Sequence, residues 1–129
     1  MKKLLISAAV AASIGTAGSV SAEEIKIGVF LGLTGPIESL VANMAPAAEQ
    51  AIAEVSDSGK FLDGTTVVAE RADTTCIDSA AATAAIERLI TAEKVAGVVG
   101  GDCSGVTAAA LTNVALPNGM VMILSLIHI

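Results

Sequence analysis

Short apolar segments alternate with longer segments of helical periodicity along this chain, and this alternation limits its fold more than any other feature. Four segments have the length and the composition of β-strands, and they are 24–33, 65–71, 95–99 and 120–123. Apolar residues at helical spacing predict the helices between them, at 37–56, 78–93 and 105–115. Pro46 predicts that the first helix is kinked or begins near Ala45. A strand–helix alternation of this kind favours parallel strands. The sequence therefore predicts an α/β fold with a doubly wound parallel sheet.

The first 22 residues have the features of a secretory signal peptide. Lys2 and Lys3 give a positively charged start, residues 4–14 are apolar, and Val20-Ser21-Ala22 is a cleavage site of small residues. The apolar run is short for a bilayer-spanning helix. We expect export with cleavage after Ala22; the alternatives are a membrane anchor and a buried helix.

The charge balance of the chain bears on its partners. The sequence has 13 acidic residues against 7 Lys and Arg. A protein that binds nucleic acid needs a basic face. We therefore expect no nucleic-acid partner.

The chain has two cysteines, Cys76 and Cys103, which follow the second and third predicted strands. The loops after parallel strands share one edge of a sheet, so the two sulfur atoms could approach each other there. An exported protein meets an oxidising environment, which favours pairing. We expect a structural disulfide; the alternative, a redox dithiol, lacks C-x-x-C spacing.

The loop after the third strand is the candidate ligand site. Gly100 and Gly101 end the strand and allow a tight turn, and Asp102-Cys103-Ser104 follows. Ligands of open α/β sheets bind at the carboxyl ends of strands. The Ser104 hydroxyl and the helix start could receive an anionic group. In the alternative interpretation, Ser104 only caps the helix that follows.

An enzyme is a weaker interpretation of the same loop. Residues 101–105 match G-x-C-x-G, the cysteine form of a nucleophile elbow, but a hydrolase needs a histidine base. The only histidine, His128, lies in the last six residues, and a disulfide-bonded Cys103 could not act as a nucleophile. The glycines at 28, 32 and 35 do not have the G-x-G-x-x-G spacing of a dinucleotide site. We therefore expect no enzyme, metal or cofactor.

Several segments resemble the leucine/isoleucine/valine-binding family of periplasmic receptors. They are the first strand and its turn (25–36), the cysteine pair, the loop 98–104 and the segment 118–123. The resemblance implies a type I, two-lobed binding protein that delivers an amino acid to an ABC transporter permease. It places Ser104 at the ligand's carboxylate, with Cys103 and Asp102 in the same ligand loop. It also places Leu40 near a ligand position that is often aromatic in the family.

The end of the chain departs from this family. Residues 124–129 stand where the family has a Ser-Pro-x-Ala-Thr loop, and no second lobe follows. We expect residues 23–123 to be part of an N-terminal lobe that does not bind ligand alone. Residues 124–129 are either a foreign tail or an ordinary terminal strand. The same lobe could instead serve as the ligand-sensing domain of a receptor or regulator.

Overall fold

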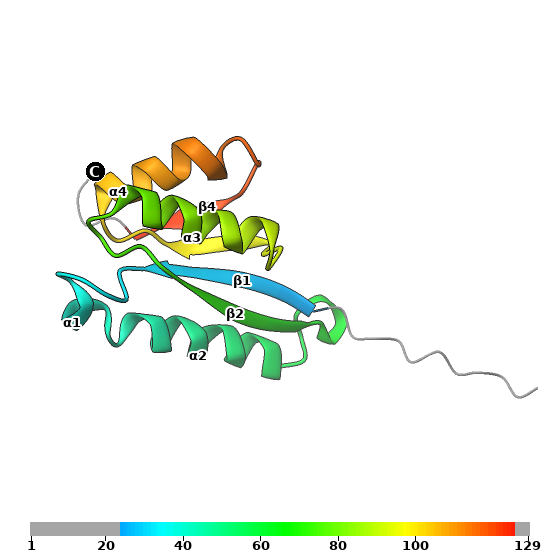
Figure 1. Cartoon of the computed structure of the whole chain (residues 1–129). Helices are drawn as coiled ribbons and strands as arrows, with labels where there is room; N and C mark the ends of the chain where they lie inside the picture. Colours follow the sequence, from blue (N-terminus) through cyan, green and yellow to red (C-terminus); the bar gives the residue numbers. More distant parts are fainter. Residues whose placement is uncertain (1–23, 126–129) are drawn as a thin grey trace, which may run out of the picture.

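The chain forms a four-stranded parallel sheet with the strand order β2-β1-β3-β4 (Figure 1). A computed structural model describes residues 24–125. The strands are β1 (Glu24–Leu31), β2 (Thr66–Asp73), β3 (Gly97–Gly100) and β4 (Met122–Leu124). The predicted parallel α/β fold is therefore confirmed. The predictions for residues 1–22 and for His128 lie outside the described residues.

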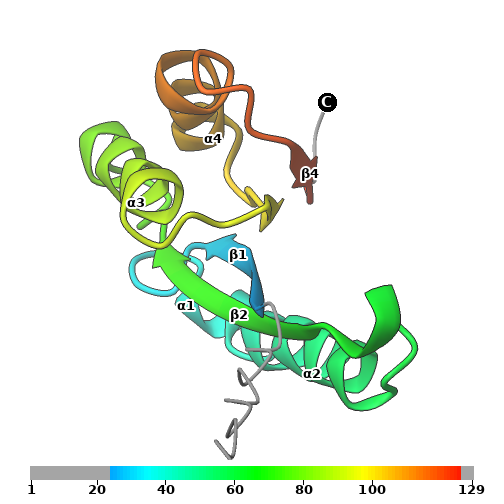
Figure 2. The ribbon, with the colours of Figure 1, turned by 90° about the vertical axis from the view of Figure 1, so that its right-hand side faces the viewer.

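Helices cover both faces of the sheet, as Figure 2 shows, with α1 and α2 on one face and α3 and α4 on the other. They are α1 (Glu38–Val41), α2 (Met44–Asp57), α3 (Ser79–Thr91) and α4 (Ser104–Ala110). A 3-10 turn, η1 (Leu62–Gly64), precedes β2, and a π-helical turn, η2 (Leu111–Ala115), continues α4. The β1–β2 connection therefore crosses one face, and the β2–β3 and β3–β4 connections cross the other, as in a doubly wound sheet.

The helix expected over residues 37–56 is interrupted at Ala42 and Asn43. Pro46 is the physical reason, because it has no N–H to donate to the Ala42 carbonyl four residues earlier. Pro46 is tolerated in the first turn of α2, where N–H groups have no helical acceptor. The prediction of a kink or of a start near Ala45 is confirmed, since α2 begins at Met44.

The strand boundaries differ from the predicted ones by a few residues. β1 ends two residues early, β2 continues to Asp73, and β3 begins at Gly97. Leu124 is the last residue of β4 and pairs with Gly100 of β3. This residue of the predicted tail therefore belongs to the sheet, as an ordinary terminal strand would require.

The larger part of the core lies between the sheet and helices α3 and α4. Its fully buried members include Phe30 of β1 and Ile86 and Leu89 of α3. The opposite face has a smaller cluster around Val29, Leu31 and Ala45. On that face α2 packs on β1 and β2 (Figure 2). The side chains of Val121 and Ile123, beside and within β4, remain 65% and 69% exposed.

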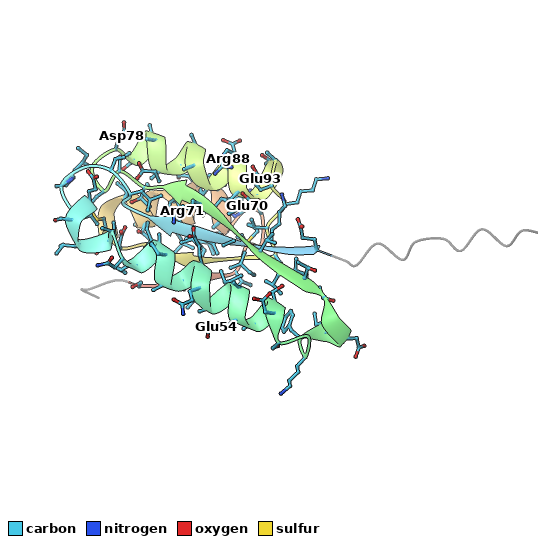
Figure 3. The ribbon with its side chains drawn as sticks, turned by 90° about the horizontal axis from the view of Figure 1, so that it is seen from below. Glu54, Glu70, Arg71, Asp78, Arg88 and Glu93 are labelled. Atoms are coloured by element: carbon cyan, nitrogen blue, oxygen red, sulfur yellow. A yellow bond between two sulfur atoms is a disulfide. The ribbon has the colours of Figure 1, made fainter. Side chains whose placement is uncertain are left out.

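Charged side chains line the free edge of the sheet at β2. Lys26 forms ion pairs with Glu70 at 3.3 Å and with Glu93 at 3.1 Å, and the hydrogen bonds that it donates to Glu93 and Glu70 raise the pKa of Lys26. Arg71 pairs with Glu49 of α2. Figure 3 shows Glu70 and Arg71 on β2 near Arg88 and Glu93. Charges of this kind protect an edge strand from pairing with another chain.

No helix within residues 24–125 has the length and apolar character that crossing a membrane requires.

Candidate functional site

The candidate site lies where β1, β2 and β3 end, because parallel strands bring their carboxyl ends to one edge of the sheet. Leu31 pairs with Asp73, and Phe30 pairs with Gly100. Three loops follow these strands: the β1 loop (32–37), the β2 loop (74–78) and the β3 loop (101–103). The start of α4 and the short helix α1 lie at the same end of the molecule (Figure 1).

A disulfide joins the β2 loop to the β3 loop. It links Cys76 to Cys103, whose Cα atoms are 5.3 Å apart. Both cysteines are thereby used, and Cys103 has no thiol that could act as the nucleophile of a hydrolase. Its backbone still precedes Ser104 directly, as the predicted ligand loop requires.

Asp102 connects the β3 loop to both neighbouring loops. Its Oδ2 accepts a hydrogen bond from the Gly32 N–H at 2.7 Å, and its Oδ1 accepts one from the Thr74 hydroxyl at 3.3 Å. The Thr74 N–H donates in turn to the Leu31 carbonyl at 2.9 Å. Asp102 is only 8% exposed. Its carboxylate therefore faces the protein interior.

A second carboxylate, Asp73, connects the β1 and β2 loops. It accepts hydrogen bonds from the Thr34 hydroxyl at 2.5 Å and from the Thr75 N–H at 2.8 Å. Burial raises the pKa of the Asp73 carboxyl, but these donors and the backbone of Leu33 outweigh burial and hold the pKa below its usual range. Asp73 is therefore a charged acceptor that orders the first two loops.

Two glycines allow close packing at this edge, Gly35 against backbone and Gly101 against a side chain. Gly35 has φ of +91°, and a Cβ there would lie 2.5 Å from the Thr75 carbonyl oxygen. Gly101 has φ of +80°, and a Cβ there would lie 2.7 Å from Thr107 Cγ2. A side chain at position 35 would force the β1 and β2 loops apart, and one at position 101 would clash with the Thr107 side chain of α4.

Ser104 is the first residue of α4, and it is exposed at this edge. The residue before it, Cys103, is the N-cap and makes no side-chain capping hydrogen bond. Within residues 24–125, the Ser104 hydroxyl has no hydrogen-bond partner. The structure thus shows no capping role for Ser104, and its hydroxyl faces solvent beside the three loops.

The predicted ligand residues lie at two separate locations in the structure. Asp102, Cys103 and Ser104 follow one another at the carboxyl end of β3, whereas Leu40 lies on α1 and is 69% exposed. Sequence reasoning missed Thr34, Asp73 and Thr74. The available signal was a short polar side chain directly after each of two apolar strands.

The electrostatics of the edge limit its chemistry. The three loops and Asp73 contain carboxylates but no Lys or Arg. Within the described residues there is also no group of three or more His, Cys, Asp or Glu that could hold a metal ion. Hydroxyl and backbone N–H groups are therefore the donors that this edge offers to a ligand.

An apolar hollow lies elsewhere in the described part of the chain. It has a volume of about 290 Å³ and is lined only by apolar residues of β1, β2, α2 and the segment before η1, among them Ile25, Val55 and Phe61. Such a hollow has no polar group to orient a ligand. We attribute this hollow to incomplete covering of the sheet on the face where α2 lies.

Comparison with known proteins matches residues 24–125 of the chain to the family described as periplasmic binding protein. No curated protein matches the sequence.

Solved structures give the same result. LivJ, the branched-chain amino acid transporter substrate-binding protein of Streptococcus pneumoniae, in complex with isoleucine, is 27% identical with a TM-score of 0.68, over 82% of this chain and 30% of that chain. The leucine-binding protein LivK of Thermotoga maritima is 27% identical with a TM-score of 0.61, over 78% and 27%. A solute-binding protein from R. palustris, in complex with 4-hydroxybenzoate, shares the fold at 24% identity with a TM-score of 0.63, over 79% and 27%. The chain thus spans less than a third of the length of these relatives.

Proposed function

Since the chain belongs to the periplasmic binding protein family, we propose that it forms the first part of the ligand-binding lobe of a receptor for a branched-chain or other small amino acid. The family implies a periplasmic location, and its members bind small solutes and work with ABC transporter permeases. The matched relatives are solute-binding proteins and not enzymes. The proposed role is therefore uptake of the bound amino acid.

The exposed hydroxyl of Ser104 is the observation that carries the proposal. It lies at the carboxyl edge of the sheet, where α/β proteins bind ligands, and it has no partner within residues 24–125. A carboxylate accepts a hydrogen bond from a hydroxyl more strongly than a neutral acceptor does. LivJ in complex with isoleucine and the leucine-binding protein LivK support an amino acid as the source of that carboxylate.

The proposed site needs a second lobe. The three loops form one open edge, and the chain covers 27–30% of the relatives named above. We infer that the remaining chain of a two-lobed protein closes over the ligand from the other side by a hinge motion. Residues 23–123 are then part of the first lobe, and residues 1–22 are its export signal.

Substitution of Ser104 in the two-lobed protein tests the function. We expect Ser104→Ala to weaken isoleucine or leucine binding about 10- to 150-fold, because one hydrogen bond to a charged group contributes roughly 1.5–3 kcal/mol. Isothermal titration calorimetry measures this change. Ser79→Ala is the matched control, since Ser79 is the exposed first residue of α3 as Ser104 is of α4.

The ligand panel separates the parts of the proposal. Binding of 4-hydroxybenzoate without binding of amino acids would contradict the ligand class but keep the carboxylate role of Ser104. Equal affinity of wild type and Ser104→Ala for a bound ligand would exclude that role. A two-lobed protein that binds no small carboxylate at all would overturn the function.

A further inference from the structure

We propose that Asp102 is a positioning residue, which holds the three loops of the site in the arrangement that presents Ser104 to the ligand. This inference rests on the proposed function, because it concerns how the same site is held ready. It differs from the sequence-based expectation, which placed Asp102 among the residues that contact the ligand.

The burial of Asp102 argues for this internal role. Both of its oxygens accept hydrogen bonds from the protein, one from the Gly32 N–H and one from the Thr74 hydroxyl. A buried carboxylate is costly unless such donors satisfy it. At 8% exposure, little of the side chain remains for a ligand.

The position of these two donors makes the connection specific. Gly32 is the first residue after β1, and Thr74 is the first residue after β2. Among the described residues, Asp102 is the only side chain that hydrogen-bonds to both Gly32 and Thr74. One carboxylate therefore sets the spacing of all three loops, two residues before Ser104.

The other connections at this edge cannot replace Asp102. The disulfide joins the β2 and β3 loops but does not reach the β1 loop. Asp73 joins the β1 and β2 loops but does not reach the β3 loop. Gly32 also leaves room for the carboxylate, since a Cβ there would lie 3.3 Å from Asp102 Oδ2 and 2.9 Å from Ile37 Cδ1.

Two measurements on the two-lobed protein test the role of Asp102. The first is hydrogen exchange of the Gly32 amide by NMR, and we expect Asp102→Ala to accelerate it about 10- to 150-fold. The second is isoleucine affinity, which we expect to fall about 10-fold in Asp102→Ala. In the Ser104→Ala background, Asp102→Ala should lower isoleucine affinity less than about 3-fold, because the two residues act on the same contact with the ligand.

Controls separate positioning from a general loss of structure. Asp102→Asn keeps the size of the side chain and one acceptor, so exchange at Gly32 should lie between wild type and Asp102→Ala. Asp63→Asn removes a carboxylate from η1, which lies outside the three loops of the site. We expect Asp63→Asn to change neither Gly32 exchange nor affinity.

The possible outcomes are distinct. Unchanged Gly32 exchange in both Asp102 variants would overturn the inference, even if the wild type binds isoleucine. Affinity losses of Asp102→Ala and Ser104→Ala that simply multiply would overturn it as well. If Asp102→Ala does not fold, Asp102→Asn alone decides through the Gly32 amide. A wild type that binds no ligand would overturn the proposed function and with it the presentation of Ser104, whereas Gly32 exchange would still show whether Asp102 holds the loops.

Discussion

Two buried threonines near the three loops differ in whether the side-chain hydroxyl has a hydrogen-bond partner. Thr74 and Thr107 are 0% and 1% exposed. The Thr74 hydroxyl donates to Asp102 and accepts from the Cys76 N–H at 3.3 Å. The Thr107 hydroxyl has no partner within the described part of the chain. An unpaired buried hydroxyl costs free energy, whereas a paired one contributes to stability.

The same isosteric substitution should therefore have opposite effects at the two sites. We expect Thr107→Val to raise the free energy of unfolding by about 1 kcal/mol and Thr74→Val to lower it by about 1–3 kcal/mol. Urea unfolding of the two variants and the wild type measures both changes. Each variant serves as the control for the other, and a loss of stability in Thr107→Val equal to that in Thr74→Val would contradict the explanation.

At the scale of elements, the sequence predicts those features that depend on residues within one segment, such as the start of a helix. The helix expected over 78–93 starts with Asp, a favoured capping residue, and the Asp78 side chain accepts hydrogen bonds from the Ala80 and Ala81 N–H groups. Pro46 likewise predicted the start of α2, because proline lacks the N–H that the interior of a helix needs. These features depend on neighbours only a few residues away, so the sequence displays them directly.

The connections between loops could not be predicted in this way. Asp102 hydrogen-bonds to Gly32, which is 70 positions away in the sequence, and to Thr74, which is 28 positions away. Such partners are fixed by the register of the strands, and apolar periodicity does not reveal that register. The position of Ser104 at the end of a central strand was predictable, whereas the absence of a capping bond from it depends on where α4 begins.

The hydrogen bonds of Asp73, which connect the β1 and β2 loops, should make the free energy of unfolding depend on pH. The pKa of Asp73 is lowered in the folded protein, so its stabilising contribution is present above the unfolded-state pKa and is lost as the pH falls through the folded-state value. We expect the free energy of unfolding to decline below about pH 4.

Substitution of Asp73 tests this assignment. Asp73→Asn should flatten the decline, which urea unfolding across the acid range measures. Asp63→Asn is the control, because Asp63 is an exposed turn residue without a hydrogen-bonded side chain within residues 24–125. Equal acid sensitivity of Asp73→Asn and wild type would assign the effect to other carboxylates, such as Glu49 and Glu93, whose pKa values are also lowered by hydrogen bonds from Arg71 and Lys26.

At the scale of the whole molecule, the two faces of the sheet are unequally covered. On the α2 face, a shallow apolar hollow of about 90 Å³ is lined in part by Ile27, Val121 and Ile123. Parallel sheets are normally covered on both faces. This imbalance is consistent with the proposal that the chain is part of a larger lobe.

A dye that binds apolar surface can detect the uncovered face. We expect the chain alone to enhance the fluorescence of 8-anilinonaphthalene-1-sulfonate, because contiguous apolar patches bind such probes. Ile123→Lys should reduce this signal. Leu116→Lys is the control, since Leu116 is 63% exposed but does not line the hollow. The two-lobed protein should give little signal, and a signal as strong as that of the chain alone would contradict the proposed domain organisation.

The strand order has a consequence for the time course of synthesis. β1 is made first, yet its two partners are β2 and β3. A ribosome adds about 5–20 residues per second, so roughly 2–8 s pass before Thr66 can pair with Glu24, and roughly 4–14 s before Gly97 can pair with Ile27. The strand at the centre of the finished sheet therefore spends the longest time without neighbours. During that interval its apolar residues, such as Val29 and Phe30, lack the neighbouring strands that flank them in the finished sheet, and unpaired apolar strands of this kind are prone to aggregation.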